Sequence, residues 1–308
     1  MIRDHLLPKG VYAAGLTPQR EDLSVDHAAL AEHAHWLLDN GCDGVVLMGT
    51  TGEANSFDVV ERMDILDAVL EAGLPAERLM VGTGCCAVPD SVTLTRHAVS
   101  RGVGGVLMLP PFYYKNVHDE GVFAAFDQVV QQVGEEALQV YLYHFPQMTA
   151  VPFTHELIAR LLEAYPETIA GMKDSSGDWM HMKSTVQAFP GFRVFAGTER
   201  YLLDILEAGG AGCITATTNV TCPLAGAIFA RWKAEDARPL QHRLTALRAA
   251  IETYPMIPAL KRIMAERTGR AAWLNMRPPQ APLGEDEAAT VLDALRQLRF
   301  FTESSDLL

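Results

Sequence analysis

The sequence lacks the basic surface that nucleic-acid binding requires. It contains 25 lysine and arginine residues against 38 aspartate and glutamate residues, which gives a formal net charge of −13. Phosphate backbones are bound by clusters of basic side chains, and no such cluster occurs along this chain. We therefore expect no nucleic-acid partner, and the negative charge favours solubility.

Long apolar runs are also missing, and cysteines are few. No run approaches the roughly 20 apolar residues that span a bilayer, and residues 1–10 lack the apolar core of a signal peptide. The five cysteines include the adjacent Cys85 and Cys86 but no Cys-x-x-Cys motif, which fits reduced thiols. His33 and His35 face different sides of an expected helix and make a poor metal-binding pair. We expect a cytoplasmic protein with no membrane partner and no bound metal.

The chain does contain a regular alternation of short apolar segments and helical ones. The apolar segments read as strands covered on both faces, because most are continuously apolar. They are residues 11–17, 44–50, 79–83, 105–110, 139–145, 169–173, 193–197 and 212–217. Helical spacing is clearest at residues 25–38, 58–71, 119–133, 153–164 and 201–208. Eight such units predict a (β/α)8 TIM barrel, and a doubly wound open sheet is the alternative.

After residue 223 the pattern is helical only. The expected helices are residues 224–233, 236–252, 258–267 and 285–299, and a proline-rich loop precedes the last of them. We predict that residues 1–223 form the barrel that carries the active site. Residues 224–308 would then form a C-terminal helical segment packed on the barrel, since no flexible linker separates the two parts.

Lys173 is the most informative single residue. An apolar segment, residues 169–172, leads into it, and a polar segment follows it directly. Burial disfavours the ammonium form of a lysine, so a lysine in this setting tends to hold more of the free amine that attacks carbonyl groups. The structural alternative is a side chain that reaches solvent or pairs with Asp174.

Polar residues follow several of the other expected strands, at the barrel end where active sites lie. Residues 49–53 read Gly-Thr-Thr-Gly-Glu, and this turn offers backbone amides and two hydroxyls to a carboxylate. Alternatively, its threonines only cap a helix.

Tyr143 faces the same side of its strand as Tyr141 and lies closer to the catalytic end. A phenol beside an amine nucleophile can relay protons, whereas the alternative is a core aromatic residue. The strand ends contain no paired carboxylates of the glycosidase type and no Gly-x-Ser-x-Gly elbow. Lys173 is therefore the best nucleophile available.

Four motifs resemble those of the dihydrodipicolinate synthase and N-acetylneuraminate lyase family of class I, Schiff-base aldolases. Residues 49–53 resemble the family's Gly-Thr/Ser-Thr-Gly-Glu, and residues 143–146 resemble its Tyr-Asn-x-Pro. Residues 171–178 are similar to the segment that holds its Schiff-base lysine, and residues 255–261 fit its C-terminal part. The resemblance covers nearly the whole chain and implies a lyase that needs no cofactor beyond a covalent imine.

The resemblance also implies roles for individual residues. Lys173 would bind the 2-oxo group and Tyr143 would be the acid/base. Thr50 would link Tyr143 to Tyr113, which the family contributes across a subunit interface, so a homotetramer built as a dimer of dimers is expected. Besides Thr50, the residues expected to bind substrate are Thr51, Gly52, Ser175, Gly197, Glu199, Arg200 and Thr215.

Departures from the family pattern bear on the substrate. Met148 stands five residues after the tyrosine, where the synthase branch has an arginine. The sialic-acid lyase branch has an Asp-Glu pair and a serine where this chain has Glu199, Arg200 and Ala216. We therefore favour a lyase that cleaves or forms pyruvate aldols or dehydrates a 2-keto-3-deoxy sugar acid. The alternatives are dihydrodipicolinate synthase activity and a non-catalytic regulator that binds a 2-oxo acid.

Arg200 is the one distal cation that the sequence places near the mouth of the barrel. We expect it to meet a second carboxylate or a hydroxyl-rich substrate tail. The alternative is that Arg200 is a solvent-exposed charge at the start of the seventh helix.

Overall fold

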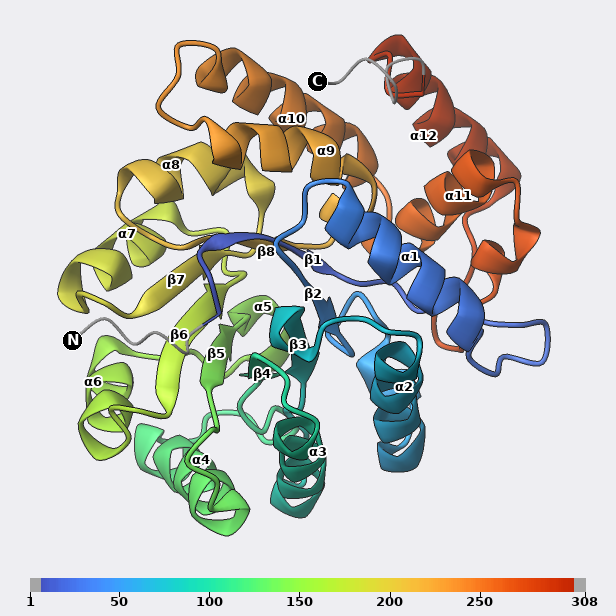
Figure 1. Cartoon of the computed structure of the whole chain (residues 1–308). Coiled ribbons are helices and arrows are strands. Elements are labelled where there is room, and N and C mark those ends of the chain that lie inside the picture. The colour runs from blue at the N-terminus through green and yellow to red at the C-terminus, as the bar shows by residue number, and fades with distance from the viewer. Residues whose placement is uncertain (1–6, 302–308) are drawn as a thin grey trace.

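The computed structural model describes residues 7–301. Eight parallel strands form a closed barrel in the order β1 to β8, and a ring of helices surrounds them (Figure 1). The strands are β1 (Gly10–Ala14), β2 (Gly44–Leu47), β3 (Leu79–Gly82), β4 (Gly105–Met108), β5 (Val140–His144), β6 (Ile169–Asp174), β7 (Arg193–Ala196) and β8 (Gly212–Thr215). The predicted TIM barrel is confirmed, and the open-sheet alternative is wrong.

One main helix follows each strand. These helices are α1 (His27–Asp39), α2 (Val59–Glu71), α3 (Val88–Ser100), α4 (Asp119–Val133), α6 (His155–Ala164), α7 (Trp179–Ala188), α8 (Leu202–Glu207) and α9 (Thr218–Ala230). A short helix, α5 (Pro146–Thr149), and the 3-10 turns η1 (Ala54–Ser56), η2 (Ala76–Arg78) and η3 (Glu199–Tyr201) lie in the connections. The predicted helix at residues 58–71 begins one residue later because Asp58 is its N-cap and forms a capping box with Glu61.

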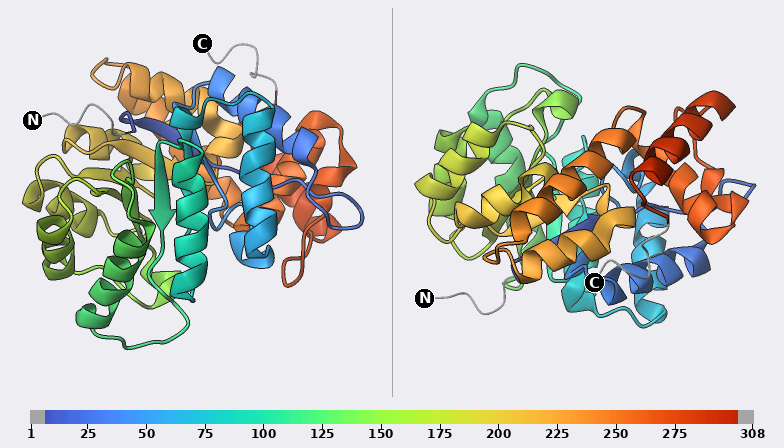
Figure 2. Two further views of the ribbon diagram at one scale, coloured as in Figure 1. Left: turned by 60° about the horizontal axis from the view of Figure 1, so that its bottom comes forward. Right: turned by 90° about the horizontal axis from the view of Figure 1, so that it is seen from above.

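Three further helices form the C-terminal part: α10 (Ala237–Ile251), α11 (Met256–Thr268) and α12 (Glu285–Gln297), with η4 (Ala271–Leu274) after α11. They lie along one side of the barrel (Figure 2). The helix α10 contacts α8, α9 and η3, so this part covers the last units of the barrel. A C-terminal helical extension is therefore confirmed.

The division that we predict at residue 223 falls inside α9, which contacts β1. As a domain boundary it stays a prediction. Residues 1–6 and 302–308, which the two predicted parts include, lie outside the described residues. Among the described helices, none combines the length and the apolar character needed to cross a membrane.

Alternating strand residues divide the core into two layers. One set of side chains fills the inside of the barrel and includes Tyr12, Tyr141, Tyr143 and Phe195. The other set lies between the strands and the surrounding helices. Because side chains alternate along a strand, Tyr141 and Tyr143 both face the inside, as predicted. The barrel interior therefore leads directly to the carboxyl ends of β5 and β6.

Candidate active site

A cavity of about 680 Å³ opens at the carboxyl ends of the strands. Seven of the residues predicted for the site line it: Thr50, Thr51, Tyr143, Lys173, Ser175, Gly197 and Arg200. The sequence predictions place these residues on four different strand ends, and the closed barrel brings them together. The C-terminal part also lines the cavity, through Arg248, Glu252, Pro255, Met256, Ile257 and Gln280.

Lys173 and Tyr143 form the floor of the cavity. They are register partners on the neighbouring strands β6 and β5. The Nζ atom of Lys173 donates a hydrogen bond to the Tyr143 hydroxyl at 3.1 Å, and it lies 4.3 Å from the centre of the Tyr143 ring. Lys173 is only 4% exposed, so the side chain stays inside the barrel instead of reaching solvent.

Thr50 extends this contact toward the turn that follows β2. Its Oγ1 atom lies 3.3 Å from the Tyr143 hydroxyl. The strand β2 ends earlier than predicted because the chain turns at Met48, whose φ of 53° lies in the left-handed region. Glu53, with a φ of 59°, lies in the same region. Thr51 lines the cavity beside Thr50, so both hydroxyls of the turn lie at the site.

The C-terminal part holds this turn from behind. The carboxylate of Glu53 forms an ion pair with Lys261 of α11, and both side chains are almost completely buried. Lys261 also donates to the backbone oxygen of Asn275 at 2.8 Å. Burial lowers the pKa of Lys261, and the Glu53 carboxylate opposes that effect. A buried pair of this kind fixes the turn that carries Thr50 and Thr51.

Gly197 allows β7 to approach β6 closely at the cavity wall. A Cβ atom at this position would lie 2.2 Å from the Ser175 hydroxyl and 2.6 Å from the backbone oxygen of Asp174. The amide of Gly197 donates to that same oxygen. Only a residue without a side chain fits at position 197, because Asp174 and Ser175, which flank this close contact, directly follow Lys173.

Four of the predicted site residues do not line the cavity. Gly52 lies behind its turn, where its backbone oxygen accepts a hydrogen bond from the Thr17 hydroxyl at 2.8 Å. Glu199 and Thr215 are fully buried and hydrogen-bonded to each other. Tyr113 is 73% exposed, and its ring packs against Tyr114, 5.4 Å away between ring centres.

Arg200 lines the cavity, but it is not the one cation there. Arg248 of α10 lines the same wall, so the expectation of a single distal cation is wrong. Arg200 forms an ion pair with Glu252, and Glu252 is also bonded to Arg248 at 3.1 Å. The sequence analysis missed Arg248 and Glu252, because they lie in α10 and directly after its end, outside the barrel, and no motif marks them.

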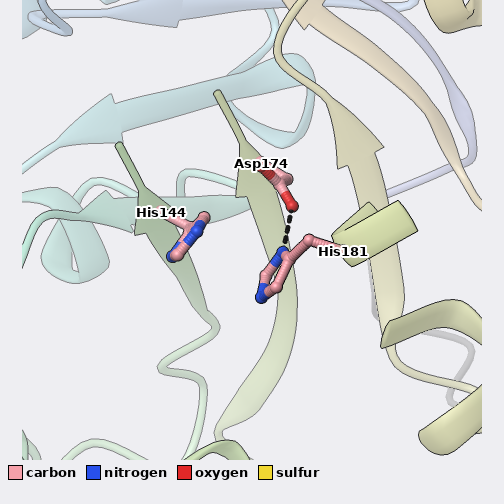
Figure 3. A group of neighbouring side chains, drawn as sticks. All are labelled: His144, Asp174 and His181. Atoms are coloured by element: carbon pink, nitrogen blue, oxygen red, sulfur yellow. Dashed lines mark hydrogen bonds and ion pairs between the residues drawn. The ribbon is translucent and has the colours of Figure 1, made fainter. Parts of the chain in front are cut away.

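A histidine cluster lies on the outer side of β5 and β6 (Figure 3). Asp174 accepts a hydrogen bond from Nδ1 of His181 at 2.6 Å, so Asp174 is bonded away from the cavity and is not the partner of Lys173. The ring of His144 stacks on that of His181, with centres 4.4 Å apart and planes 14° apart. Although burial alone would raise the pKa of Asp174, His181 holds it below its usual range, and Asp174 raises the pKa of His181.

The same three side chains bring ligand-type atoms within 4.8 Å of one another. Metal coordination uses the lone pairs in the imidazole planes, and two stacked rings direct these lone pairs side by side instead of toward one ion. The Nδ1 atom of His144 also accepts from the amide of Phe153 at 3.1 Å. These contacts suit a hydrogen-bonded cluster, and we assign it no metal.

Comparison with known proteins gives the family. The model of the dihydrodipicolinate synthetase family matches residues 7–298. The chain belongs to this family. An uncharacterised DapA-like lyase of Chloroflexus aurantiacus is 36% identical over 293 residues, which cover 94% of this chain and 97% of the relative. A probable 2-dehydro-3-deoxy-D-pentonate aldolase of Escherichia coli is 30% identical, with 78% and 81% coverage.

Among solved structures, dihydrodipicolinate synthase from Agrobacterium tumefaciens is similar, with a TM-score of 0.87 and 32% identity over 94% of this chain and 99% of that one. The resemblance inferred from the four motifs is thereby confirmed. Membership of the family also confirms the prediction that the chain is an enzyme of the lyase class.

Proposed function

We propose that this member of the dihydrodipicolinate synthetase family is a class I lyase that forms an imine between Lys173 and a 2-oxo acid. The observation that carries the proposal is the 3.1 Å contact between the Lys173 amine and the Tyr143 hydroxyl at the floor of the cavity. An amine nucleophile with a positioned proton donor and acceptor is what carbinolamine formation and dehydration require.

In the proposed reaction the Nζ atom of Lys173 attacks C2 of the 2-oxo acid. Tyr143 then protonates the C2 hydroxyl of the carbinolamine, which leaves as water, and the imine forms. In aldol cleavage Tyr143 then takes the proton of the C4 hydroxyl as the C3–C4 bond breaks. The bonding electrons enter the enamine, an aldehyde leaves, and protonation of C3 followed by hydrolysis releases pyruvate and the free amine. In dehydration C3 loses a proton and the C4 hydroxyl leaves as water.

The turn after β2 is the proposed site for the substrate carboxylate. Thr50 and Thr51 offer hydroxyl donors there, close to the carbonyl carbon that Lys173 attacks. Ser175 and Gly197 also line the cavity. A carboxylate held on this side directs the rest of the substrate toward Arg200 and the C-terminal part.

The proposal includes a homotetramer in which Tyr113 approaches Thr50 of another subunit. In its support, Tyr113 and Tyr114 are 73% and 74% exposed, and Val117 in the same loop is 40% exposed. A patch of large apolar side chains on a loop is typical of a protein–protein contact. The cytoplasmic location stays a prediction.

A panel of 2-keto-3-deoxy acids tests the proposal. Release of pyruvate indicates an aldolase, and loss of water without pyruvate indicates a dehydratase. A trapped imine with no turnover across the panel would favour the regulator. Synthase activity is the less favoured alternative, because Met148 lines the cavity where that branch has an arginine.

A further inference from the structure

Four charged side chains form a row that leads from the core to the distal wall of the cavity, and we call them the charge row: Glu199, Arg248, Glu252 and Arg200. Arg248 Nη1 donates to Glu199 at 2.8 Å, and Arg248 Nε donates to Glu252 at 3.1 Å. The other oxygen of Glu252 pairs with Arg200. Charges of opposite sign therefore alternate along the whole row.

The row begins in the core and ends at the cavity. Side-chain exposure rises from 0% at Glu199 through 12% at Arg248 and 31% at Glu252 to 39% at Arg200. Burial alone would raise the pKa of Glu199, but Arg248 and the hydroxyls of Thr215 and Thr217 hold it below the usual range. Glu199 is thus ionised, and it fixes Arg248 from the side away from the cavity.

The row carries no net charge, because two guanidinium groups face two carboxylates. Among the described residues, a substrate tail that enters the cavity therefore finds no cation at the distal wall that lacks a carboxylate partner. A carboxylate or phosphate that accepted from the remaining N–H groups of Arg200 would lie near the Glu252 carboxylate, which pairs with the same guanidinium. Like charges at such a short distance repel, and the repulsion selects against that substrate.

A hydroxyl group meets no such obstacle. It can accept from Arg200 and donate to Glu252 at the same time, and the ion pair stays intact. Gln280 adds an uncharged amide to the same cavity, while Met148, Met256 and Ile257 offer apolar surface to a carbon chain. Both kinds of contact suit the carbon and hydroxyl groups of a polyol.

We infer that the charge row makes the enzyme specific for substrates whose distal tail is uncharged and hydroxylated, and that Glu252 is the residue that excludes an anionic tail. The inference rests on the proposed function, since it assumes that the 2-oxo acid end is bound at Lys173. From the sequence we expect Arg200 to meet either a second carboxylate or a hydroxyl-rich substrate tail. The inference keeps the hydroxyl-rich tail and excludes the second carboxylate.

Two acids that differ only at C6 test this inference. The C6 group is a hydroxymethyl in 2-keto-3-deoxygluconate and a carboxylate in 2-keto-3-deoxyglucarate. We expect kcat/KM to be at least ~10-fold higher for the first, because repulsion acts on the second alone. Equal or faster turnover of the dicarboxylate, by pyruvate release or by water loss, overturns the inference.

Variants test the role of Glu252 directly. Glu252→Gln leaves Arg200 unpaired, so we expect kcat/KM for the dicarboxylate to rise about tenfold relative to the monocarboxylate. Arg200→Gln removes the outer cation and leaves Glu252 paired with Arg248 alone, so the ratio should shift in the opposite direction. Glu207→Gln is the matched control, since Glu207 pairs with Arg238 and does not line the cavity, and the ratio should not change. If Glu252→Gln and Glu207→Gln give the same ratio, Glu252 does not exclude the anion.

Borohydride reduction with pyruvate, carried out on every variant, separates two kinds of failure. An adduct on Lys173 together with good turnover of the dicarboxylate overturns only the inference about the tail. If no adduct forms, the proposed function fails and the inference fails with it.

Discussion

The amine of Lys173 lies 3.1 Å from the hydroxyl of Tyr143, across two neighbouring strands on which the two residues are register partners. Strand pairing thus sets the distance between nucleophile and phenol, and no flexible loop separates them. Sites carried by strands are held more precisely than sites on loops.

Replacement of Tyr143 by phenylalanine should slow the reaction far more than it weakens substrate binding. The ring stays in place while the proton donor is lost, so kcat should fall by about 10²–10⁴-fold. Tyr141→Phe is the matched control, because Tyr141 faces the same interior but does not line the cavity. Steady-state kinetics on the best substrate of the panel compare the two, and equal losses would contradict the role given to Tyr143.

Removal of Lys261 should destabilise the protein, because Glu53 would remain as a buried, unpaired charge. For Lys261→Met we expect a loss of about 3 kcal/mol in the free energy of unfolding, measured in urea. Adding Glu53→Gln should recover most of the loss, since no buried charge is then left. Glu32→Gln removes an exposed partner of Arg270 and should have little effect. A Lys261→Met protein as stable as the Glu32→Gln protein would contradict the account.

Gly197→Ala should disturb the site through packing alone. The added Cβ would collide with the backbone of Asp174, next to Lys173, and the cost of such overpacking is about 1–3 kcal/mol. We expect a lower melting temperature and lower activity. Gly121→Ala is the control, because a Cβ there meets no atom within 4 Å. Unchanged activity in Gly197→Ala would show that β6 and β7 tolerate a wider separation.

Stability should depend on pH through the two stacked histidines, with opposite signs. Burial lowers the pKa of His144 to about 4, below the value of 6.5 in the unfolded chain. Between these values the unfolded chain binds the proton and the folded protein does not, so stability falls as pH falls from 6.5 to about 4. The pKa of His181 is raised, so its stabilisation is complete below 6.5 and is lost as pH rises through the raised value.

His144→Asn should therefore flatten the acid side of the stability profile. A difference of 2.5 units between 6.5 and about 4 corresponds to about 3 kcal/mol. His181→Asn should flatten the other side, and His242→Asn, at an exposed position, should change neither. Urea unfolding from pH 4 to 9 measures all three. An acid side that is equally steep in His144→Asn and wild type would contradict the account.

The barrel was predictable from the sequence because its strands are continuously apolar and covered on both faces. The strand ends were less predictable. At β1, β2 and β8 the expected strands continue beyond the observed ends, since turns such as the one at Met48 depend on backbone angles that apolar composition does not reveal. Two of the main helices, α3 and α7, were not among those predicted, because serine, threonine and other polar residues interrupt their apolar spacing.

The core of the site was predictable for a different reason. Lys173, Tyr143 and Thr50 end different strands, and a closed parallel barrel must bring such ends together. Arg248 and Glu252 could not be predicted, because their position depends on how α10 packs over the barrel. The pairing of Asp174 with His181 likewise depends on which face of α7 meets β6.

Borohydride reduction in the presence of pyruvate tests the central claim most directly. We predict that mass spectrometry finds the reduced adduct on the peptide that contains Lys173, and that Lys173→Met abolishes it while Lys183→Met does not. An unmodified Lys173, under conditions that trap a known Schiff-base aldolase of the family, would contradict the account.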